Sequence, residues 1–110
     1  MNDAVLYDLT DDVATLTLNR PESLNAFNHD MRERLVEFTA RLEEDDSVRC
    51  VVLQGAGDNF CAGGDIKMFR EAIAVDSEAR RRQYREFLHI THIAMLSLAR
   101  LPVPVTARVQ

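Results

Sequence analysis

The pattern of apolar and polar positions along the chain predicts four short β-strands. Residues 5–9 and 13–18 are rich in β-forming residues and flank a polar Thr-Asp-Asp turn, so we expect a β-hairpin. Residues 48–54 form a nearly continuous apolar run, which favours a strand covered on both faces. A fourth strand is predicted over residues 105–109. Because the sequence ends within it, we expect either a fragment of a longer chain or completion by another chain.

Between the hairpin and the third strand, the spacing of apolar residues predicts an amphipathic helix. Asn28 can cap its first turn, and the acidic run at residues 43–46 marks its end, which we interpret as solvated rather than as a docking patch. The predicted apolar stripe contains four residues: Met31, Leu35, Phe38 and Leu42. The preceding residues 19–26 are expected to form a loop whose start Pro21 keeps from being helical.

Two further helices are predicted between the third and fourth strands. A short one over residues 66–74 would take Asp65 as its N-cap. A long one would take Ser77 as its cap and end before two closely spaced prolines. Its predicted apolar stripe contains six residues: Tyr84, Phe87, Leu88, Thr91, Met95 and Leu98. The order strand, strand, helix, strand, helix, helix, strand is typical of an α/β fold in which strands feed covering helices.

Composition and charge narrow the classes of function. The chain has 110 residues, enough for one domain with a modest core. Its formal net charge is −5 with no basic stripe, which argues against a nucleic-acid partner, and no apolar run reaches transmembrane length. The first residues do not resemble a secretory signal, and Cys50 and Cys61 form neither a disulfide framework nor a zinc-binding spacing. We therefore expect a cytoplasmic protein without a membrane partner.

The strongest candidate for chemistry is the octapeptide Phe-Cys-Ala-Gly-Gly-Asp-Ile-Lys at residues 60–67. Three small residues before a capped helix let another molecule approach the backbone and leave N–H groups pointing out of the helix start. Such a site suits a negatively charged oxygen, including the transient oxyanion of a thioester reaction. Lys67 lies one turn into the predicted helix and can reach a phosphate at its mouth. The alternative is that the glycines only form a tight turn.

Two other interpretations of this region have less support. Gly55 and Gly57 after a strand suggest a dinucleotide-binding fingerprint, but Phe60 occupies the place of its third glycine. Cys61 at a helix start could act as a nucleophile with a lowered pKa. No general base accompanies it in the motif, so we favour a small buried residue that packs under the loop.

Three groups of polar residues elsewhere could serve chemistry, and each has a simpler explanation. His89 and His92 share the long helix, but no further metal ligands are identifiable, so no metal site is predicted. Glu22 and Glu71 are available for acid–base chemistry, although nothing in their spacing marks them as a pair. Four arginines near the start of the long helix could meet ligand phosphates but fit a solvated face: Arg80, Arg81, Arg82 and Arg85.

The octapeptide, together with Val-Val-Leu-Gln-Gly-Ala-Gly at residues 51–57, resembles the first oxyanion-hole segment of the enoyl-CoA hydratase/isomerase (crotonase) superfamily. Other segments match in the family's order. Leu-Thr-Leu-Asn-Arg-Pro-Glu at residues 16–22, with Asn25 and Ala26, resembles its N-terminal signature. Val-Pro-Val-Thr-Ala at residues 103–107 resembles the strand that leads to its second glycine loop. The resemblance covers nearly the whole chain, and the octapeptide is its specific part.

The resemblance implies a fold and an activity. The fold would be α/β, a crotonase-like spiral of β-β-α units, with residues 1–110 as the N-terminal part of a single domain that lacks the second oxyanion loop and later helices. The full-length protein would be an acyl-CoA-processing enzyme, a lyase or isomerase. It would bind a CoA thioester and stabilise the enolate-like oxyanion through backbone N–H groups, one of them from Gly64.

The resemblance also implies a set of substrate-binding residues. They are Ser23, Leu24, Ala26, Ala62, Gly63, Gly64, Asp65, Ile66 and Lys67. Ala62 and Ile66 would lie against the adenine and pantetheine of coenzyme A, and residues 23–26 would line its other side. Residues 23 and 24 include no Lys or Arg, unlike many relatives, which argues against a charged contact with the phosphates there.

Coenzyme A would be part of the substrate, and no cofactor is implied. The family's acid–base carboxylates would lie beyond Gln110, so hydration, isomerisation, decarboxylation, dehalogenation and thioester hydrolysis stay open. The resemblance further implies fatty acid metabolism and a homo-oligomer, a trimer or a hexamer. We expect the isolated 110 residues to be inactive. The alternative function is a non-catalytic acyl-CoA-binding or partner-binding module.

Overall fold

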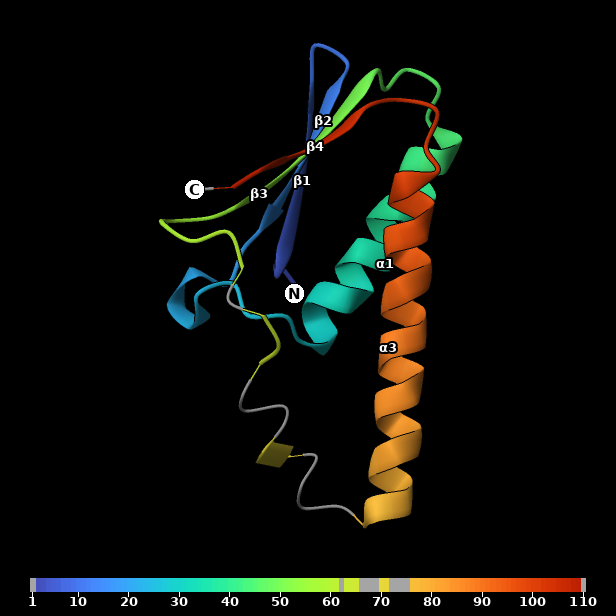
Figure 1. Cartoon of the computed structure of the whole chain (residues 1–110). Helices are drawn as coiled ribbons and strands as arrows, with labels where there is room; N and C mark the ends of the chain where they lie inside the picture. Colours follow the sequence, from blue (N-terminus) through green and yellow to red (C-terminus); the bar gives the residue numbers. More distant parts are fainter. Residues whose placement is uncertain (1, 62, 66–69, 72–75, 110) are drawn as a thin grey trace.

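A computed structural model describes residues 2–61, 63–65, 70–71 and 76–109. Within them, a four-stranded sheet carries two helices, α1 (His29–Glu44) and α3 (Ser77–Ala99), on one side (Figure 1). The strands lie side by side in chain order: β1 (Val5–Thr10), β2 (Val13–Leu18), β3 (Cys50–Gly55) and β4 (Val105–Arg108). The predicted α/β class and all four predicted strands are confirmed.

The strand pairing sets where the loops begin. Asp11 and Asp12 have φ angles of 52° and 64°, a turn whose twist matches that of a hairpin, and β1 pairs antiparallel with β2 as predicted. β2 and β3 are parallel, as are β3 and β4, and α1 and α3 form the two crossovers. Leu18 at the end of β2 lies opposite Gly55 at the end of β3. The loops that follow these two strands therefore start side by side.

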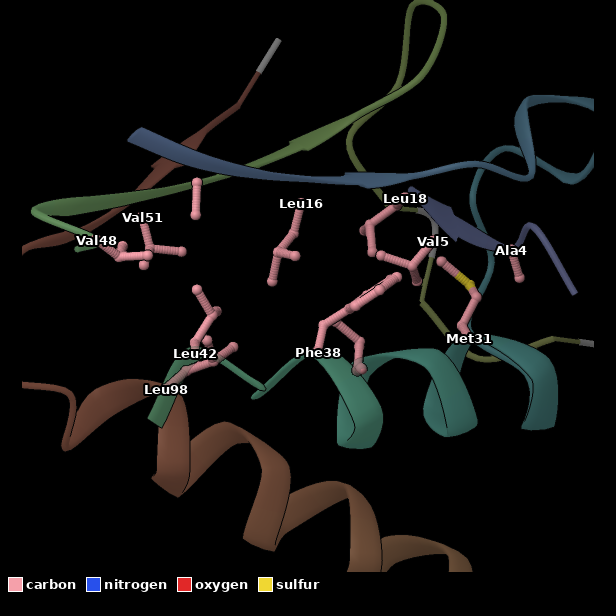
Figure 2. Packing of buried hydrophobic residues seen from close by; sticks show 12 residues of the cluster. Ala4, Val5, Leu16, Leu18, Met31, Phe38, Leu42, Val48, Val51 and Leu98 are labelled. Atoms are coloured by element: carbon pink, nitrogen blue, oxygen red, sulfur yellow. The ribbon is translucent and has the colours of Figure 1, made fainter. Parts of the chain in front are cut away.

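Helix α1 buries the stripe that the sequence predicts. The Asn28 side chain accepts a hydrogen bond from the Met31 backbone N–H at 3.1 Å and caps the first turn. The predicted stripe residues are all buried: Met31, Leu35, Phe38 and Leu42. Figure 2 shows this side of the core facing Leu16 and Leu18 of the sheet. Each large side chain buried here contributes about 1.5–3 kcal/mol to stability.

Helix α3 begins one residue away from its predicted cap. Asp76, not Ser77, is the N-cap, because its carboxylate accepts hydrogen bonds from the backbone N–H groups of Glu78 at 2.9 Å and Ala79 at 3.4 Å. Ser77 is the first helical residue. A negatively charged side chain is favourable at this position, because it is also attracted to the positive end of the helix dipole.

The predicted apolar stripe of α3 is partly wrong. Leu88 and Met95 are 55% and 37% exposed, whereas Phe87 and Leu98 are buried together with Ala94. The reason is the packing arrangement, since α3 lies against α1 rather than against the sheet (Figure 2). Within the described residues, α1 covers one side of α3, and the flanking apolar residues stay exposed.

Two smaller expectations also need correction. Within the described residues β3 is covered on one face only: Val51 is fully buried, but Val52 is half-exposed, because both long helices lie on the same side of the sheet (Figure 1). The loop after β2 is not helical at Asn19 and Arg20, as predicted, but it then forms an unpredicted turn of 3-10 helix, η1 (Pro21–Ser23). Proline fits the first helical position, because the N–H that it lacks has no partner there. No helix in the described ranges is long and apolar enough to cross a membrane.

Candidate functional site

The loop after β2 and the loop after β3 meet at the ends of these strands. Gly55 leaves no room for a side chain, because a Cβ there would lie 2.3 Å from the backbone oxygen of Asn59 and 2.6 Å from that of Phe60. The chain thus folds tightly back over the end of β3. This close packing accounts for a glycine at position 55 without a bound dinucleotide.

Gly64 lies in a short parallel bridge with Phe27 from the first loop. The Phe27 N–H donates to the Gly63 oxygen at 2.6 Å, and the Asp65 N–H donates to the Phe27 oxygen at 3.0 Å. Successive residues of an extended segment point their backbone groups to opposite sides, so the Gly64 N–H faces away from Phe27. Gly64 is exposed, and its N–H has no hydrogen-bond partner among the described residues. The bridge therefore fixes an outward-facing amide.

Gly63 supports this arrangement through its backbone conformation. Its φ of 101° lies in a region that side-chain-bearing residues rarely adopt, and, its chain neighbours aside, no described residue has an atom within 4 Å of the place where a Cβ would be. The requirement for glycine here is conformational rather than steric. The turn at Gly63 aims the following residues along Phe27.

Asn25 joins the two loops from inside. It is fully buried, and its backbone has a φ of 56°, a region that Asn tolerates better than most residues. Its Oδ1 accepts from the Arg20 backbone N–H at 2.8 Å, and its Nδ2 donates to the backbone oxygens of Ala56 at 2.9 Å and Asn59 at 2.7 Å. One buried side chain thus bonds three backbone groups from two loops.

Arg20 forms a second connection with its guanidinium group. Nη1 lies 2.8 Å from Oδ2 of Asp65 and also donates to the Ala26 backbone oxygen. Nη2 donates to the Ser23 hydroxyl at 3.4 Å. The two charged side chains are only 17% and 11% exposed, so solvent screens this pair less than a surface pair. Arg20 therefore connects the first loop to the segment that holds Gly64.

The predicted substrate-binding residues that the structure describes lie on these two segments. In the first loop, Ala26 is buried, Ser23 is half-buried, and Leu24 is 52% exposed with a φ of 55°. On the other segment, Gly63 and Gly64 are exposed, and Asp65 is buried. The Phe27 bridge holds the two segments next to each other.

Several predictions fall outside the described residues. Among the substrate-binding positions these are Ala62, Ile66 and Lys67. The phosphate contact of Lys67 and the capping of a helix by Asp65 are predictions of the same kind. Of the helix predicted over residues 66–74, the structure describes Arg70 and Glu71, which are helical and exposed.

The structure gives little support to the other candidate sites, which are a nucleophilic Cys61 and a metal site at His89 and His92. Cys61 packs against the core but is half-buried rather than buried, and its Sγ accepts from the Gly63 N–H at 3.5 Å. His89 and His92 are exposed on α3. In the part of the chain that is described, no cluster of three or more His, Cys, Asp or Glu side chains could hold a metal ion.

Sequence reasoning did not identify the roles of Arg20 and Asn25, although both belong to the N-terminal signature segment. A signal was present in residue type. Asn accepts positive φ and pairs its side chain with backbone groups, and Arg can bond a carboxylate and a carbonyl at once. Their partners Asn59 and Asp65 lie 34 and 45 residues away in the chain, so local patterns did not reveal the pairing.

Comparisons with known proteins were made for sequence and for structure. The family model for enoyl-CoA hydratase/isomerase matches residues 13–110. The chain is 48% identical over 66 residues to the 1,2-epoxyphenylacetyl-CoA isomerase of Escherichia coli K12, a match that covers 60% of this chain and 25% of that enzyme. It is 42% identical over 66 residues to the small ribosomal subunit protein mS47 of Schizosaccharomyces pombe, covering 60% of this chain and 15% of that protein.

The crystal structure of an enoyl-CoA hydratase from Mycobacterium smegmatis has the same fold over this segment. The TM-score is 0.85 at 43% identity, and the match covers 96% of this chain and 39% of that one. This chain spans well under half the length of these relatives. The family model covers most of the chain and the structural match nearly all of it, and on these grounds the chain belongs to the enoyl-CoA hydratase/isomerase (crotonase) family.

Proposed function

We propose that this chain is the part of an acyl-CoA enzyme that binds a CoA thioester and stabilises its enolate-like oxyanion. The observation that carries the proposal is the amide of Gly64, which the Phe27 bridge holds facing outward on an exposed segment. A fixed N–H aimed at developing negative charge is worth about 3–4 kcal/mol in acyl chemistry. The E. coli relative is named as a CoA-ester isomerase, which supports the same substrate class.

The coenzyme would lie between the two joined segments. Gly63, Gly64 and Asp65 would form one wall, and Ser23, Leu24 and Ala26 the other. Support comes from the bridge that places the segments together and from the exposed apolar side chain of Leu24, which suits contact with an uncharged part of the coenzyme. Coenzyme A enters as part of the substrate, and the proposal includes no further cofactor.

We also propose an enzyme class, an oligomeric state and a cellular location. The full-length protein would act as a lyase or isomerase of fatty acid metabolism, as a cytoplasmic trimer or hexamer. Names of relatives support the enzyme class, whereas the assembly and location rest on family likeness. Light scattering on the full-length protein tests the assembly, since a monomer would contradict it.

The direct test changes the Gly64 amide in the full-length protein. Gly64→Pro deletes the N–H, and Gly64→Ala is the matched control that keeps it. We expect Gly64→Pro to lower kcat for enoyl-CoA substrates by about a hundredfold to a thousandfold, and Gly64→Ala to lower it far less. Circular dichroism checks that both variants fold. A folded Gly64→Pro variant with unchanged thioester turnover would show that this amide is not the donor.

A second function, a non-catalytic acyl-CoA-binding or partner-binding module, has one observation in its favour. The matched segment also occurs in a protein named as a ribosomal subunit component, so the family segment is not confined to proteins named as enzymes. Calorimetry with a CoA thioester, run beside a turnover assay, separates the two functions. Binding without turnover by the full-length protein supports the module, and turnover supports the enzyme.

A further inference from the structure

We propose that Arg20 is a positioning residue for the oxyanion donor and acts on Gly64 through Asp65. This inference rests on the proposed function, because it assigns a role at the same site. Arg20 itself lies in the loop after β2 and would touch neither the thioester nor the Gly64 amide. Its effect is on the orientation of the segment that carries that amide.

The contacts of Arg20 form a closed connection around Gly64. Its guanidinium bonds the Asp65 carboxylate at 2.8 Å and also the Ala26 backbone oxygen. Asp65 directly follows Gly64, and Ala26 directly precedes Phe27, the residue that forms the bridge. Arg20 thus ties the end of each bridged segment to the other. The Gly64 N–H shares a peptide plane with the Gly63 oxygen, so rotation of this plane would break the hydrogen bond from Phe27, while the Arg20–Asp65 ion pair holds the residue that follows Gly64 in place.

Arg20 is itself held in place. Its backbone N–H donates to Oδ1 of Asn25 at 2.8 Å, and its backbone oxygen accepts from the Asn25 N–H at 2.8 Å. Because Asn25 is fully buried and bonded to the loop after β3, the guanidinium starts from a fixed backbone. A planar guanidinium can bond the carboxylate and the carbonyl together, which a lysine ammonium in this place would do less well.

This position differs from the other two ion pairs among the described residues. Arg34–Glu37 is a pair within one helix, and the Arg49–Asp12 pair has a separation of 3.8 Å, with side chains that are 85% and 54% exposed. Surface pairs of this kind contribute little. The Arg20–Asp65 pair is short, shielded and adjacent to the proposed donor. Arg49→Gln is therefore a matched control that removes the same charge at an exposed site.

The test measures the thioester carbonyl directly. An acyl-CoA thioester labelled with ¹³C at its carbonyl is bound to the full-length protein, and the infrared carbonyl band is compared with that of free ligand. Hydrogen bonding from an oxyanion donor lowers this frequency. We expect a clear downward shift in the parent protein and in Arg49→Gln, and a smaller shift in Arg20→Gln. Asp65→Asn keeps the shape of its side chain and should show the same reduction.

Kinetics supply the second readout. A 1 Å misplacement of a catalytic group can cost about a hundredfold, so we expect kcat of Arg20→Gln to fall by about tenfold to a hundredfold with KM changed less than about threefold. Arg20→Lys should lie between Arg20→Gln and the parent. If Arg20→Gln does not fold, Asp65→Asn and Arg20→Lys carry the test. If folded variants of Arg20 and Asp65 kept the parent's carbonyl shift and kcat, the role of Arg20 would be refuted, and the proposed function would still stand. A parent protein that binds the thioester without any shift would overturn the proposed function and this inference with it.

Discussion

Asn25→Asp provides a sharp test of how the two site loops are joined, because it changes one group and keeps the shape of the side chain. The replaced Nδ2 donates to the backbone oxygens of Ala56 and Asn59 at 2.9 and 2.7 Å. An Asp oxygen in the same place would face these two oxygens as a third acceptor. The Arg20 N–H would keep its partner, since the other oxygen of Asp can still accept from it.

The magnitude follows from the groups left unpaired. A fully buried acceptor that loses its partner costs about 1–3 kcal/mol, and because these two hydrogen bonds are partly buried, the two carbonyls together cost at most about 2–6 kcal/mol. Burying a carboxylate at a fully buried position adds to this cost. Against a typical unfolding free energy of about 5–15 kcal/mol, the loss is large enough to measure without ambiguity.

The effect of Asn25→Asp should also depend on pH. Burial and the facing carbonyl oxygens would raise the pKa of the introduced carboxyl in the folded state above its unfolded value of about 3.9. The folded variant then binds more protons than the unfolded one between these two pKa values, so its stability rises as pH falls through that window. The protonated acid can also donate to one of the carbonyls. The gap to the parent protein should therefore narrow in acid.

Urea unfolding of the full-length protein, followed by circular dichroism at several pH values, measures this loss. Asn59→Asp is the matched control, because it makes the same chemical change on an exposed side chain in the adjoining loop. Surface changes of this kind usually stay within about 0.5 kcal/mol. If Asn25→Asp cost no more than Asn59→Asp, the buried amide would not be what holds the loops together.

Two further changes test other parts of the structure. Gly55→Ala would place a Cβ 2.3 Å from the backbone oxygen of Asn59, so we expect the loop to shift and the unfolding free energy, measured with urea, to fall by about 1–3 kcal/mol. An unchanged unfolding free energy would contradict the close packing described for Gly55. Tyr7→Phe removes a buried hydroxyl without a hydrogen-bond partner among the described residues and keeps the ring contact with Phe38, so stability at neutral pH should be unchanged or greater by about 1 kcal/mol. Burial raises the pKa of Tyr7 above 10.0, so the stability linked to its proton is fully present below pH 10 and lost as pH rises through the folded pKa; Tyr7→Phe should lose less stability in alkali, and an equal loss would contradict this account.

The parts of the fold that the sequence predicts well are those decided by local pattern. The hairpin combines two β-rich runs with a turn whose residues tolerate positive φ. Helix α1 has a capping residue and apolar residues that recur every three or four positions. The stripe of α3 was harder, because which side is buried depends on whether a helix packs on the sheet or on another helix. Leu88 and Met95 fit a helical period but stay exposed.

In the candidate site, too, the sequence predicts the features that depend on local pattern and not those that depend on distant contacts. The glycine segment stands out in the sequence because small residues before a predicted helix are a local signal. The roles of Arg20 and Asn25 depend on partners across the fold, such as Asp65 and the backbone of Asn59. No period or spacing encodes such contacts. They follow only once parallel strands bring Leu18 and Gly55 to the same edge of the sheet.

A crystal structure of the full-length protein with a non-reactive acyl-CoA analogue would show whether the Gly64 amide binds the thioester oxygen. We expect the analogue's thioester oxygen to lie about 2.7–3.1 Å from the Gly64 nitrogen, with the bridge to Phe27 intact. A bound analogue whose thioester oxygen lies away from Gly64, with the amide bonded elsewhere, would contradict this role of Gly64.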